Sequence, residues 1–564
     1  MGYSSWGLTL CPHLEVIIME VSRRVATSIG RVGVVVALTC TVSGLGFVPL
    51  TSCGNAGVGD PNKPRDDGGG SVTDPDSMVT RPDGAITHPD GADRDGSAVD
   101  SSAIDADGGS SSPTPDAGSD GPATGGCAAV PVPVAGVGRE LHVTTTGNDG
   151  NADGSAARPY ASLSTAVRSA VAGDTVLVHG GVYALTSAQV LNPNGRTGSP
   201  VTIRSVEGES VVFDGAAVQL GNYDGLIRVG GSYAVVDGFE VVNSRGGGIQ
   251  LVAANQVMIR RCRIHNIAFQ ALGGSGNDIV LQQNEVYDSV TSNANGVVDI
   301  ANNGFGWSPA VLSFWFSGTM MPSRRWTVEN NHIHDNWGEC LDALHLEDSV
   351  FRGNVLHDCY SVNLYVDDAR AMRIEGNYIY NSTNKYNRAV GGESAHGISM
   401  GTESAAAPVV LQDITVANNL ILSTSVGILF ARFSGLGYTG IGLYYNVIAN
   451  TRKDAVWCDA AATSSGVARN NVFFRGANNN TVGVNSTGWI IDHNVWPNGG
   501  QQGTASIVAD PQFTAPGNGG TAPDGFRLKP GSPALSAGTP VVAVLNDYTC
   551  KTRSSTAPSI GIYE

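Results

Sequence analysis

Two stretches of the chain, 338–348 and 361–370, concentrate side chains that can move protons or hold a cation. In a β-strand alternate residues point to the same side, so the polar residues of each stretch can share one face. The two stretches lie 23 residues apart, which is the period of a repeat described below. The candidate residues are Glu339, Asp342, His345, Glu347, Tyr365, Asp367, Asp368 and Arg370.

A third stretch, 395–400, continues the pattern after a long insertion at 382–395 that carries Arg388, and it adds His396 and Ser399. Acid, imidazole, phenol and guanidinium groups that converge on one surface are typical of a binding or catalytic groove. Aligned by the repeat, the three stretches place Asp342, Tyr365 and Ser399 in one column, His345 on Asp368, Glu347 on Arg370, and His396 near Glu339.

These residue types fit two reactions. β-Elimination from a uronate requires a base beside the acidic C5 proton and a cation that neutralises the adjacent carboxylate. Hydrolysis of a glycosidic bond requires two carboxyl groups across that bond. For elimination, the candidate bases are His396, His345 and Tyr365. The candidate cations are Arg388, Arg370 and a calcium ion held by Asp367 and Asp368. For hydrolysis, Asp342 could form the carboxyl pair with Glu339, Asp367 or Asp368. Cross-strand pairs that merely stabilise a sheet surface are the alternative interpretation.

The elements that position these residues follow from a repeat, apolar-x-x-Asn-x-apolar. Its successive steps are 23, 22, 47, 23, 23, 42, 27, 25 and 23 residues. We interpret the 47 as two turns, with a buried coil in the aromatic stretch 307–326, and the 42 as one turn with a long insertion. Short strands at this period, without helical spacing, predict a solenoid whose strands pair with the coils above and below. The fourth positions are Phe239, Cys262, Asn284, Asn331, Asn354, Asn377, Asn419, Asn446, Asn471 and Asn494.

The repeat also predicts a corner. Its two apolar positions are five residues apart, so one straight strand cannot turn both inward. Asn tolerates left-handed backbone angles better than other non-glycine residues, so we place the turn at the Asn itself. Stacked at one corner, the Asn side chains can hydrogen-bond from coil to coil. Their role is therefore structural, and they are excluded from the candidate site.

The start of the repeat region predicts a cap for the first coil, because a solenoid must close its ends. A short helix is expected behind Ser162 as N-cap, and a strand is expected at 175–178. Its apolar face is formed by Leu163, Ala166, Val167 and Ala170. With 74 Gly and only 15% charged residues, the composition suits short strands and tight turns. The predicted fold is all-β, a parallel β-helix with an N-terminal capping helix.

The N-terminus indicates export. Three arginines precede an apolar run at 32–50, and Met19 is an alternative start. The sequence Leu50-Thr51-Ser52-Cys53 resembles the bacterial lipobox, which predicts lipidation of Cys53 and anchoring at the cell envelope or surface. Ordinary signal-peptidase cleavage and secretion is the alternative. Residues 1–53 are therefore interpreted as a signal peptide.

Residues 54–126 contain 14 Asp, no Glu and no aromatic residue, which predicts a disordered acidic linker before a folded domain at 127–564. The net charge of −17 argues against nucleic acid as a partner. We expect a monomer that reaches a membrane only through its lipid anchor. Cys127 and Cys550 flank the folded domain and could tie its ends, while disulfides and buried thiols both stay open for the other cysteines of the domain.

Three features of residues 139–564 match a known family. They are an opening at 143–150, 158–160, 172–176 and 180–183, the Asn repeat, and an ending at 510–513, 526–534 and 560–564. In these features the chain resembles the pectin-lyase-like superfamily of right-handed parallel β-helices, in its secreted bacterial branch. The resemblance implies a polysaccharide partner bound in a groove on the long face of the helix. The superfamily includes lyases, hydrolases, epimerases and non-catalytic surface proteins, so fold alone does not fix activity.

We therefore expect an extracytoplasmic carbohydrate-active protein, with a polysaccharide lyase ahead of a glycoside hydrolase. A non-catalytic glycan-binding or adhesion module is the alternative. Exposed aromatic rows beside a carboxylate-poor face would favour binding alone. A groove with two or more titratable groups of perturbed pKa would favour catalysis. Calcium is the one cofactor that these residues suggest.

Overall fold

The structure is a computed structural model that describes residues 127, 129–296, 308–313, 321–386, 393–403, 411–431, 437–458, 465–476, 488–499, 502–517 and 523–564. All of them belong to one compact unit of the chain, Asp107–Glu564. The predicted signal peptide and linker, Arg388, and the Trp307 end of the aromatic stretch lie outside the described residues. Within the described part, no helix combines the length and the apolar character that crossing a membrane requires.

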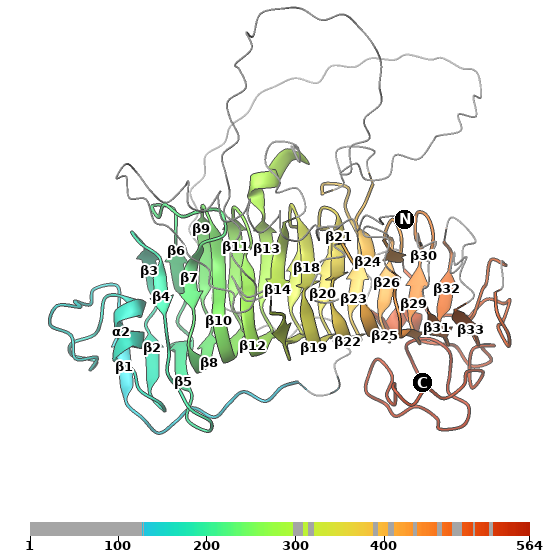
Figure 1. The fold of residues 1–564 in the computed structure, drawn as a ribbon, viewed down its shortest axis with the longest axis horizontal. Helices are drawn as coiled ribbons and strands as arrows, with labels where there is room; N and C mark the ends of the chain where they lie inside the picture. The colour runs from blue at the N-terminus through green and yellow to red at the C-terminus, as the bar shows by residue number, and fades with distance from the viewer. Residues whose placement is uncertain are drawn as a thin grey trace, which may run out of the picture. The chain divides into compact units, whose positions relative to one another are not determined.

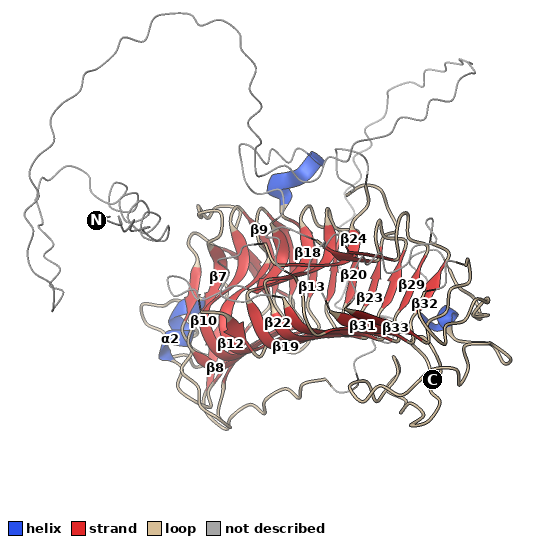
Figure 2. Ribbon diagram, turned by 45° about the vertical axis from the view of Figure 1, so that its right-hand side comes forward, coloured by secondary structure: helices blue, strands red, loops and turns tan. Residues whose placement is uncertain are grey.

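The described residues form a parallel β-helix, as predicted, and its coils have three faces (Figures 1 and 2). Faces 1 and 2 make one 22-stranded sheet, because the long strands β10 (Gly247–Arg260) and β12 (Leu272–Gln282) run through the corner between them. Face 1 contains the first halves of β10 and β12 with β4 (Gln189–Leu191), β7 (Gly225–Val229), β14 (Pro309–Ser313), β18 (Glu339–Leu344), β21 (Val362–Asp367), β24 (His396–Gly401), β27 (Ile428–Phe430) and β30 (Val456–Cys458).

Face 2 contains the second halves of β10 and β12 with β1 (Glu140–Val143), β2 (Thr175–Val178), β5 (Val201–Ser205), β8 (Ser232–Asp237), β15 (Ser323–Arg324), β16 (Thr327–Glu329), β19 (Leu346–Arg352), β22 (Arg370–Glu375), β25 (Gln412–Ala417), β28 (Ile441–Tyr444), β31 (Gly466–Arg469) and β33 (Trp489–Asp492). Face 3 is a separate 11-stranded sheet. Its strands are β3 (Gly181–Ala184), β6 (Val211–Asp214), β9 (Glu240–Ser244), β11 (Arg263–Ile267), β13 (Glu285–Ser289), β17 (His332–His334), β20 (Val355–His357), β23 (Tyr378–Tyr380), β26 (Leu420–Leu422), β29 (Val447–Ala449) and β32 (Val472–Phe474).

The first coil is capped by helix α2 (Leu163–Ser169), which confirms the prediction. The Ser162 hydroxyl accepts a hydrogen bond from the Thr165 backbone N–H, and Leu163, Ala166 and Val167 are buried. Two short 3-10 helices, η1 (Thr291–Gly296) and η2 (Pro523–Phe526), lie in loops. Inside the coils one continuous apolar core runs along the helix, because each strand turns alternate residues inward.

The Asn ladder exists, but its conformational basis differs from the prediction. From Asn284 to Asn494, each ladder Nδ2 donates to the Oδ1 of the Asn in the next coil, at 2.9 to 3.0 Å. The left-handed residue is the one before each ladder Asn, for example Asn330 at φ 56° and Gly376 at φ 64°. The ladder position itself therefore selects Asn for its buried amide, which donates and accepts at once.

The 47-residue step is one coil, so its interpretation as two turns was wrong. Asn284 donates directly to Asn331, and β13 pairs with β17 through Glu285 and His332. The described parts of the stretch 307–326, β14 and β15, belong to this same coil, and Trp326 is buried. Because a long excursion adds no rung to the ladder, step length alone does not count coils. The 42-residue step is likewise one coil, as predicted.

The two ends of the folded unit are tied together by the Cys127–Cys550 disulfide, the pairing considered from the sequence. Residues 129–138 then run along the outside of face 2 toward the cap (Figure 1). The Val130 carbonyl accepts a hydrogen bond from Gln282 at 2.9 Å, and Gly138 N–H donates to Gly173. A second disulfide, Cys340–Cys359, joins face 1 to the turn after β20, whereas Cys262 is a buried thiol.

Candidate functional site

The predicted column of polar residues on face 1 exists in the predicted register. Asp342 of β18 pairs with Tyr365 of β21, and Tyr365 pairs with Ser399 of β24. The neighbouring Leu341 and Leu364 pair with each other inside the core. Alternation along each strand therefore turns Asp342, Tyr365 and Ser399 to the outer side of the coil.

Although it faces outward from the coil, this column is buried. Asp342 is 5% exposed, and Asp367, at the end of the neighbouring strand, is 6% exposed. Burial, reinforced by the charge of Glu339, Glu403 and Asp368, raises the pKa of Asp342 well above its ordinary value. Burial, reinforced by Asp342, Glu403 and Asp368, raises the pKa of Asp367 in the same way. The cause is a cluster of like charges in a medium that solvates them poorly.

Glu403 is a member of this cluster that the sequence reasoning missed. Its Oε1 accepts a hydrogen bond from the Tyr365 hydroxyl at 2.8 Å. Glu403 lies two residues past β24, so the available signal was a carboxylate directly after the third aligned strand. Burial raises the pKa of Tyr365 well above 10, and the nearby carboxylates add to the effect. Tyr365 therefore stays protonated and acts as a hydrogen-bond donor, which removes it as a candidate base.

The two candidate histidines occupy different parts of face 1. His345 lies at the corner after β18 in a left-handed conformation, and Asp368 has the same conformation one coil further. Burial lowers the pKa of His345 to about 4, so its imidazole is neutral at neutral pH. His396 begins β24 and pairs with Val362. Val362 thus separates His396 from Glu339 in the column, so these two residues are two coils apart.

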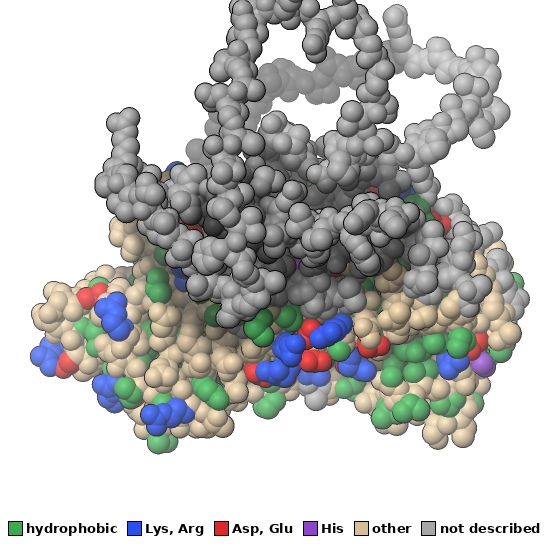
Figure 3. Space-filling model, viewed as in Figure 1, with side chains coloured by type: hydrophobic (Ala, Val, Ile, Leu, Met, Phe, Trp, Pro, Cys, Tyr) green, Lys and Arg blue, Asp and Glu red, His purple; other side chains and the backbone are tan. Residues whose placement is uncertain are grey.

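The predicted cation Arg370 lies on face 2. It stacks on Glu347, as predicted, and its Nη2 contacts the Glu347 carboxylate at 2.6 Å. Glu347 binds Arg324 on its other side, also at 2.6 Å. Figure 3 shows acidic and basic side chains gathered over the part of face 2 where β19 and β22 lie. Arg370 is therefore engaged in a surface ion-pair network away from the carboxylate cluster.

Comparison with known proteins supports the predicted family. A family described as "Pel9A-like, right handed beta helix region" matches residues 141–309, and one described as "Right handed beta helix region" matches residues 313–437. The second match contains every candidate site residue described above. Right-handed β-helix models over these two regions support the predicted resemblance to the pectin-lyase-like superfamily.

Individual relatives of this chain are distant. The chain is 30% identical to pectate lyase PEL9 of Emericella nidulans over 155 residues, which are 25% of this chain and 38% of that protein. It is 36% identical to the uncharacterized protein YwoF of Bacillus subtilis over 95 residues, 17% of this chain and 20% of that protein. The chain thus matches well under half of the length of either relative.

Two solved structures align with most of the chain at low sequence identity. The crystal structure of pectate lyase Pel9A aligns with a TM-score of 0.46 and 16% identity, over 76% of this chain and 96% of that one. The complex of XylC with xylose aligns with a TM-score of 0.49 and 14% identity, over 75% of this chain and 98% of that one.

The face 1 carboxylates of this pectin-lyase-like chain fit a hard cation. Asp342 Oδ1, Asp367 Oδ1 and Ser399 Oγ are buried and have no hydrogen-bond partner among the described residues. Buried oxygens without donors are costly, and clustered carboxylates repel one another. Calcium takes 6–8 oxygen ligands, including carboxylates, and would relieve both penalties. Asp342 and Asp367, which lie on neighbouring strands and repel each other, are therefore the residues placed to hold it, whereas Tyr365 separates Ser399 from Asp342.

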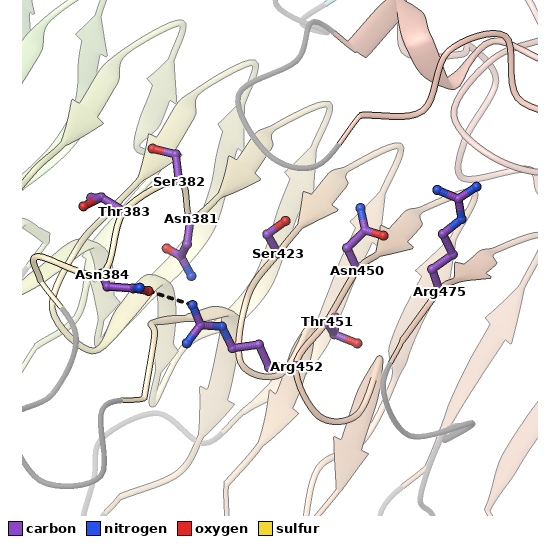
Figure 4. A pocket seen from close by; sticks show the side chains of 9 residues that line it. All are labelled: Asn381, Ser382, Thr383, Asn384, Ser423, Asn450, Thr451, Arg452 and Arg475. Atoms are coloured by element: carbon purple, nitrogen blue, oxygen red, sulfur yellow. Dashed lines mark hydrogen bonds between the residues drawn. The ribbon is translucent and has the colours of Figure 1, made fainter. Parts of the chain in front are cut away.

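A separate cavity of about 380 Å³ lies where face 3 turns toward face 1 (Figure 4). It is polar and crosses successive coils. Arg452 reaches across it to donate to Asn384 Oδ1 at 2.8 Å, and Arg475 lies at its far end. Two guanidinium groups in a polar cavity suit an anionic ligand. The other lining residues are Asn381, Ser382, Thr383, Ser423, Asn450 and Thr451.

Proposed function

We propose that the protein is a calcium-dependent polysaccharide lyase that cleaves uronate-containing polymers outside the cytoplasm. The observation that carries this proposal is the buried carboxylate cluster around Asp342 and Asp367, whose ionised form a bound cation would stabilise. The similarity of the chain over 155 residues to a protein named pectate lyase is consistent with the proposal.

A bound calcium ion would neutralise the substrate carboxylate beside the C5 proton and so make that proton easier to remove. The chain's own residues would supply the base. His345 is a neutral imidazole at neutral pH, and His396 begins the strand that carries Ser399, so both stay candidates. Tyr365 would orient Glu403 through its hydrogen bond.

A glycoside hydrolase is the second candidate, favoured by the raised pKa of Asp342 and Asp367. A carboxyl group that keeps its proton near neutral pH can protonate a leaving oxygen. However, hydrolysis needs only two carboxyl groups, whereas Glu339, Asp368 and Glu403 also contribute charge here. Several titratable groups of perturbed pKa lie on one face, which favours catalysis over a module that only binds.

The test is a spectrophotometric assay of the purified chain with pectate, alginate and glycosaminoglycans, in calcium or in a chelator. We expect the ultraviolet absorbance of an unsaturated uronate to rise with at least one polymer and to stop in the chelator. Release of reducing ends without that absorbance would show hydrolysis and contradict the proposed lyase reaction. No product from charged or neutral glycans would leave glycan binding alone.

Export is supported by the two disulfides, because disulfides persist in oxidising compartments and are rare in the cytosol. We therefore expect that Cys127, Cys550, Cys340 and Cys359 resist alkylation in protein isolated from its source without reductant. After reduction, the alkylated mass should increase by four further adducts. If all four cysteines react before reduction, the protein matured in a reducing compartment and the export proposal fails.

A further inference from the structure

A row of stacked rings crosses face 3, away from the carboxylate cluster of face 1. The rings are those of His265, Tyr287, His334, His357 and Tyr380, from five successive coils. Neighbouring ring centroids are 4.6, 5.4, 4.9 and 4.4 Å apart, and neighbouring planes lie within 14° of parallel. Stacking thus fixes the orientation of the two central imidazoles.

A third imidazole joins them from the side. His332 is two residues before His334 on β17, and their ring centroids are 4.0 Å apart. The Nε2 atoms of His332 and His357 are 2.9 Å apart. This separation is about 0.4 Å shorter than the roughly 3.3 Å between two nitrogen ligands of one tetrahedral ion.

The nitrogens of all three histidines lie close together. One ligand atom from each of His332, His334 and His357 lies within 4.8 Å of the other two. Two tetrahedral ligands at about 2.0–2.1 Å from one ion are about 3.3–3.4 Å apart, so side-chain movements alone would bring the three nitrogens around one ion. His334 Nε2 is buried and makes no hydrogen bond to a described residue, and Glu285 Oε1 lies 3.7 Å from it.

Carboxylates accept hydrogen bonds from the Nδ1 atoms of two of the three imidazoles. His334 Nδ1 is 2.7 Å from Asp335 Oδ2, and His357 Nδ1 is 2.8 Å from Asp358 Oδ2. A carboxylate accepts, so each Nδ1 carries the proton and a neutral ring has its lone pair on Nε2. Asp358 is itself fixed by Ser382, whose N–H and hydroxyl donate at 2.7 and 2.6 Å. This carboxylate–histidine arrangement is the usual support of a metal-binding imidazole.

We propose that the Nε2 atoms of His332, His334 and His357 bind a divalent transition metal of the zinc class on face 3, with Glu285 as a further oxygen ligand. Three imidazoles select zinc, cobalt, nickel or copper over calcium and magnesium, which prefer oxygen. The metal would replace the proton between two of these nitrogens. In the metal-free protein, His332 Nε2 donates a hydrogen bond to His357 Nε2, and that proton leaves Nε2 when the ion binds.

The charges around the imidazoles also suit a divalent ion. The carboxylates of Glu285, Asp335 and Asp358 lie 2.7 to 3.7 Å from histidine nitrogens of the group. A cation bound among them would balance their negative charge.

The experiment titrates the chelator-stripped full chain with Zn²⁺ alone by calorimetry, in excess calcium so that oxygen sites are filled. Co²⁺ replaces zinc in a parallel titration, because its visible spectrum reports nitrogen ligation in the wild-type chain without any variant. We expect one equivalent to bind and His357→Asn to weaken binding by about 100-fold. Asp335→Asn, which removes a positioning residue, should weaken binding by about 10-fold.

His265→Asn is the matched control, because His265 stacks in the same row but lies outside the three-histidine group. It should leave the affinity within about 3-fold of wild type, and circular dichroism should show that every variant folds. Equal affinity in the His357→Asn chain, or a Co²⁺ spectrum without nitrogen ligation, would overturn the proposal. No polysaccharide enters the assay, so its outcome is independent of lyase activity.

Discussion

Asp342→Asn is expected to lower kcat/KM on the uronate polymer by about 100-fold or more, with little loss of folded protein. The substitution keeps the shape of the side chain and removes one of the buried charges that would hold calcium. Cation neutralisation of developing charge is worth several kcal/mol, and about 2.7 kcal/mol corresponds to 100-fold. The measurement is initial rate against calcium concentration, in which the variant should also need more calcium. Asp348→Asn is the matched control, because Asp348 is an exposed left-handed residue of the next strand, β19.

The same substitution should raise the melting temperature of the calcium-free chain at pH 7. The pKa of Asp342 in the folded state is raised above its ordinary value of 3.8. Its contribution to stability is therefore fully present below about pH 4 and is lost as pH rises toward the folded-state pKa. Asn carries no charge, so the variant escapes that loss, and the difference from wild type should vanish below about pH 4.

The activity and the melting temperature of Asp342→Asn together show whether the carboxylate cluster serves catalysis or only supports the fold. If Asp342→Asn destabilises the chain at pH 7 and leaves activity unchanged, the carboxylate supports the coil and the calcium site is wrong. A variant that is more stable but inactive is what stored charge repulsion predicts. In that variant, calcium should also raise the melting temperature less than it does in wild type, because binding stabilises only a competent site.

The register of the candidate site could be predicted from the sequence because a solenoid makes it a local property. Once Asn354 is fixed as the corner of one coil and Asn331 as that of the one before, counting places Asp342 on Tyr365. No long-range information is needed, since neighbouring coils are also neighbours in sequence. The same counting, applied to His334 and residue 357, would have revealed the face 3 histidines.

Counting failed where the chain leaves the coil. The excursion between Asn284 and Asn331 has about twice the period in length, yet it returns to the next rung. Loops tolerate insertions at little entropic cost, so their length carries no information about coil number. Glu403 was missed for a related reason, because it lies past the end of the strand, where counting from the ladder Asn does not place it beside Tyr365.

The prediction placed the left-handed corner one residue too late, because it assigned both the left-handed backbone and the ladder hydrogen bonds to the same Asn. Backbone strain falls on the residue before, which is Gly at 353 and 376, Asn at 330, 418 and 470, and even Tyr445. The ladder position instead needs an amide that can donate twice and accept twice in a buried site. Propensity alone favours Asn for both positions, and only the hydrogen bonds distinguish them.

The largest loss of stability is expected from Asn377→Ala, by about 3–5 kcal/mol in free energy of unfolding. Asn377 Nδ2 donates to Phe351 O and to Asn419 Oδ1, and its Oδ1 accepts from the backbone N–H and Nδ2 of Asn354. Asn377 is fully buried, so no water replaces these bonds. Two donors of Asn354 would be left unsatisfied, at about 1–3 kcal/mol each. Urea denaturation followed by circular dichroism measures the change.

Gly376→Asn is the control that separates the amide from the backbone. Asn already stands at this left-handed position in other coils, as at 330, 418 and 470, so the substitution should change the free energy of unfolding by less than about 1 kcal/mol. Asn377→Gly, which also removes the amide, should cost at least as much as Asn377→Ala. If Gly376→Asn were the costlier change, backbone conformation and not the ladder would govern this corner. The prediction therefore rests on hydrogen bonds between coils, which hold the strands of face 1 in the register that brings Asp342, Tyr365 and Ser399 together.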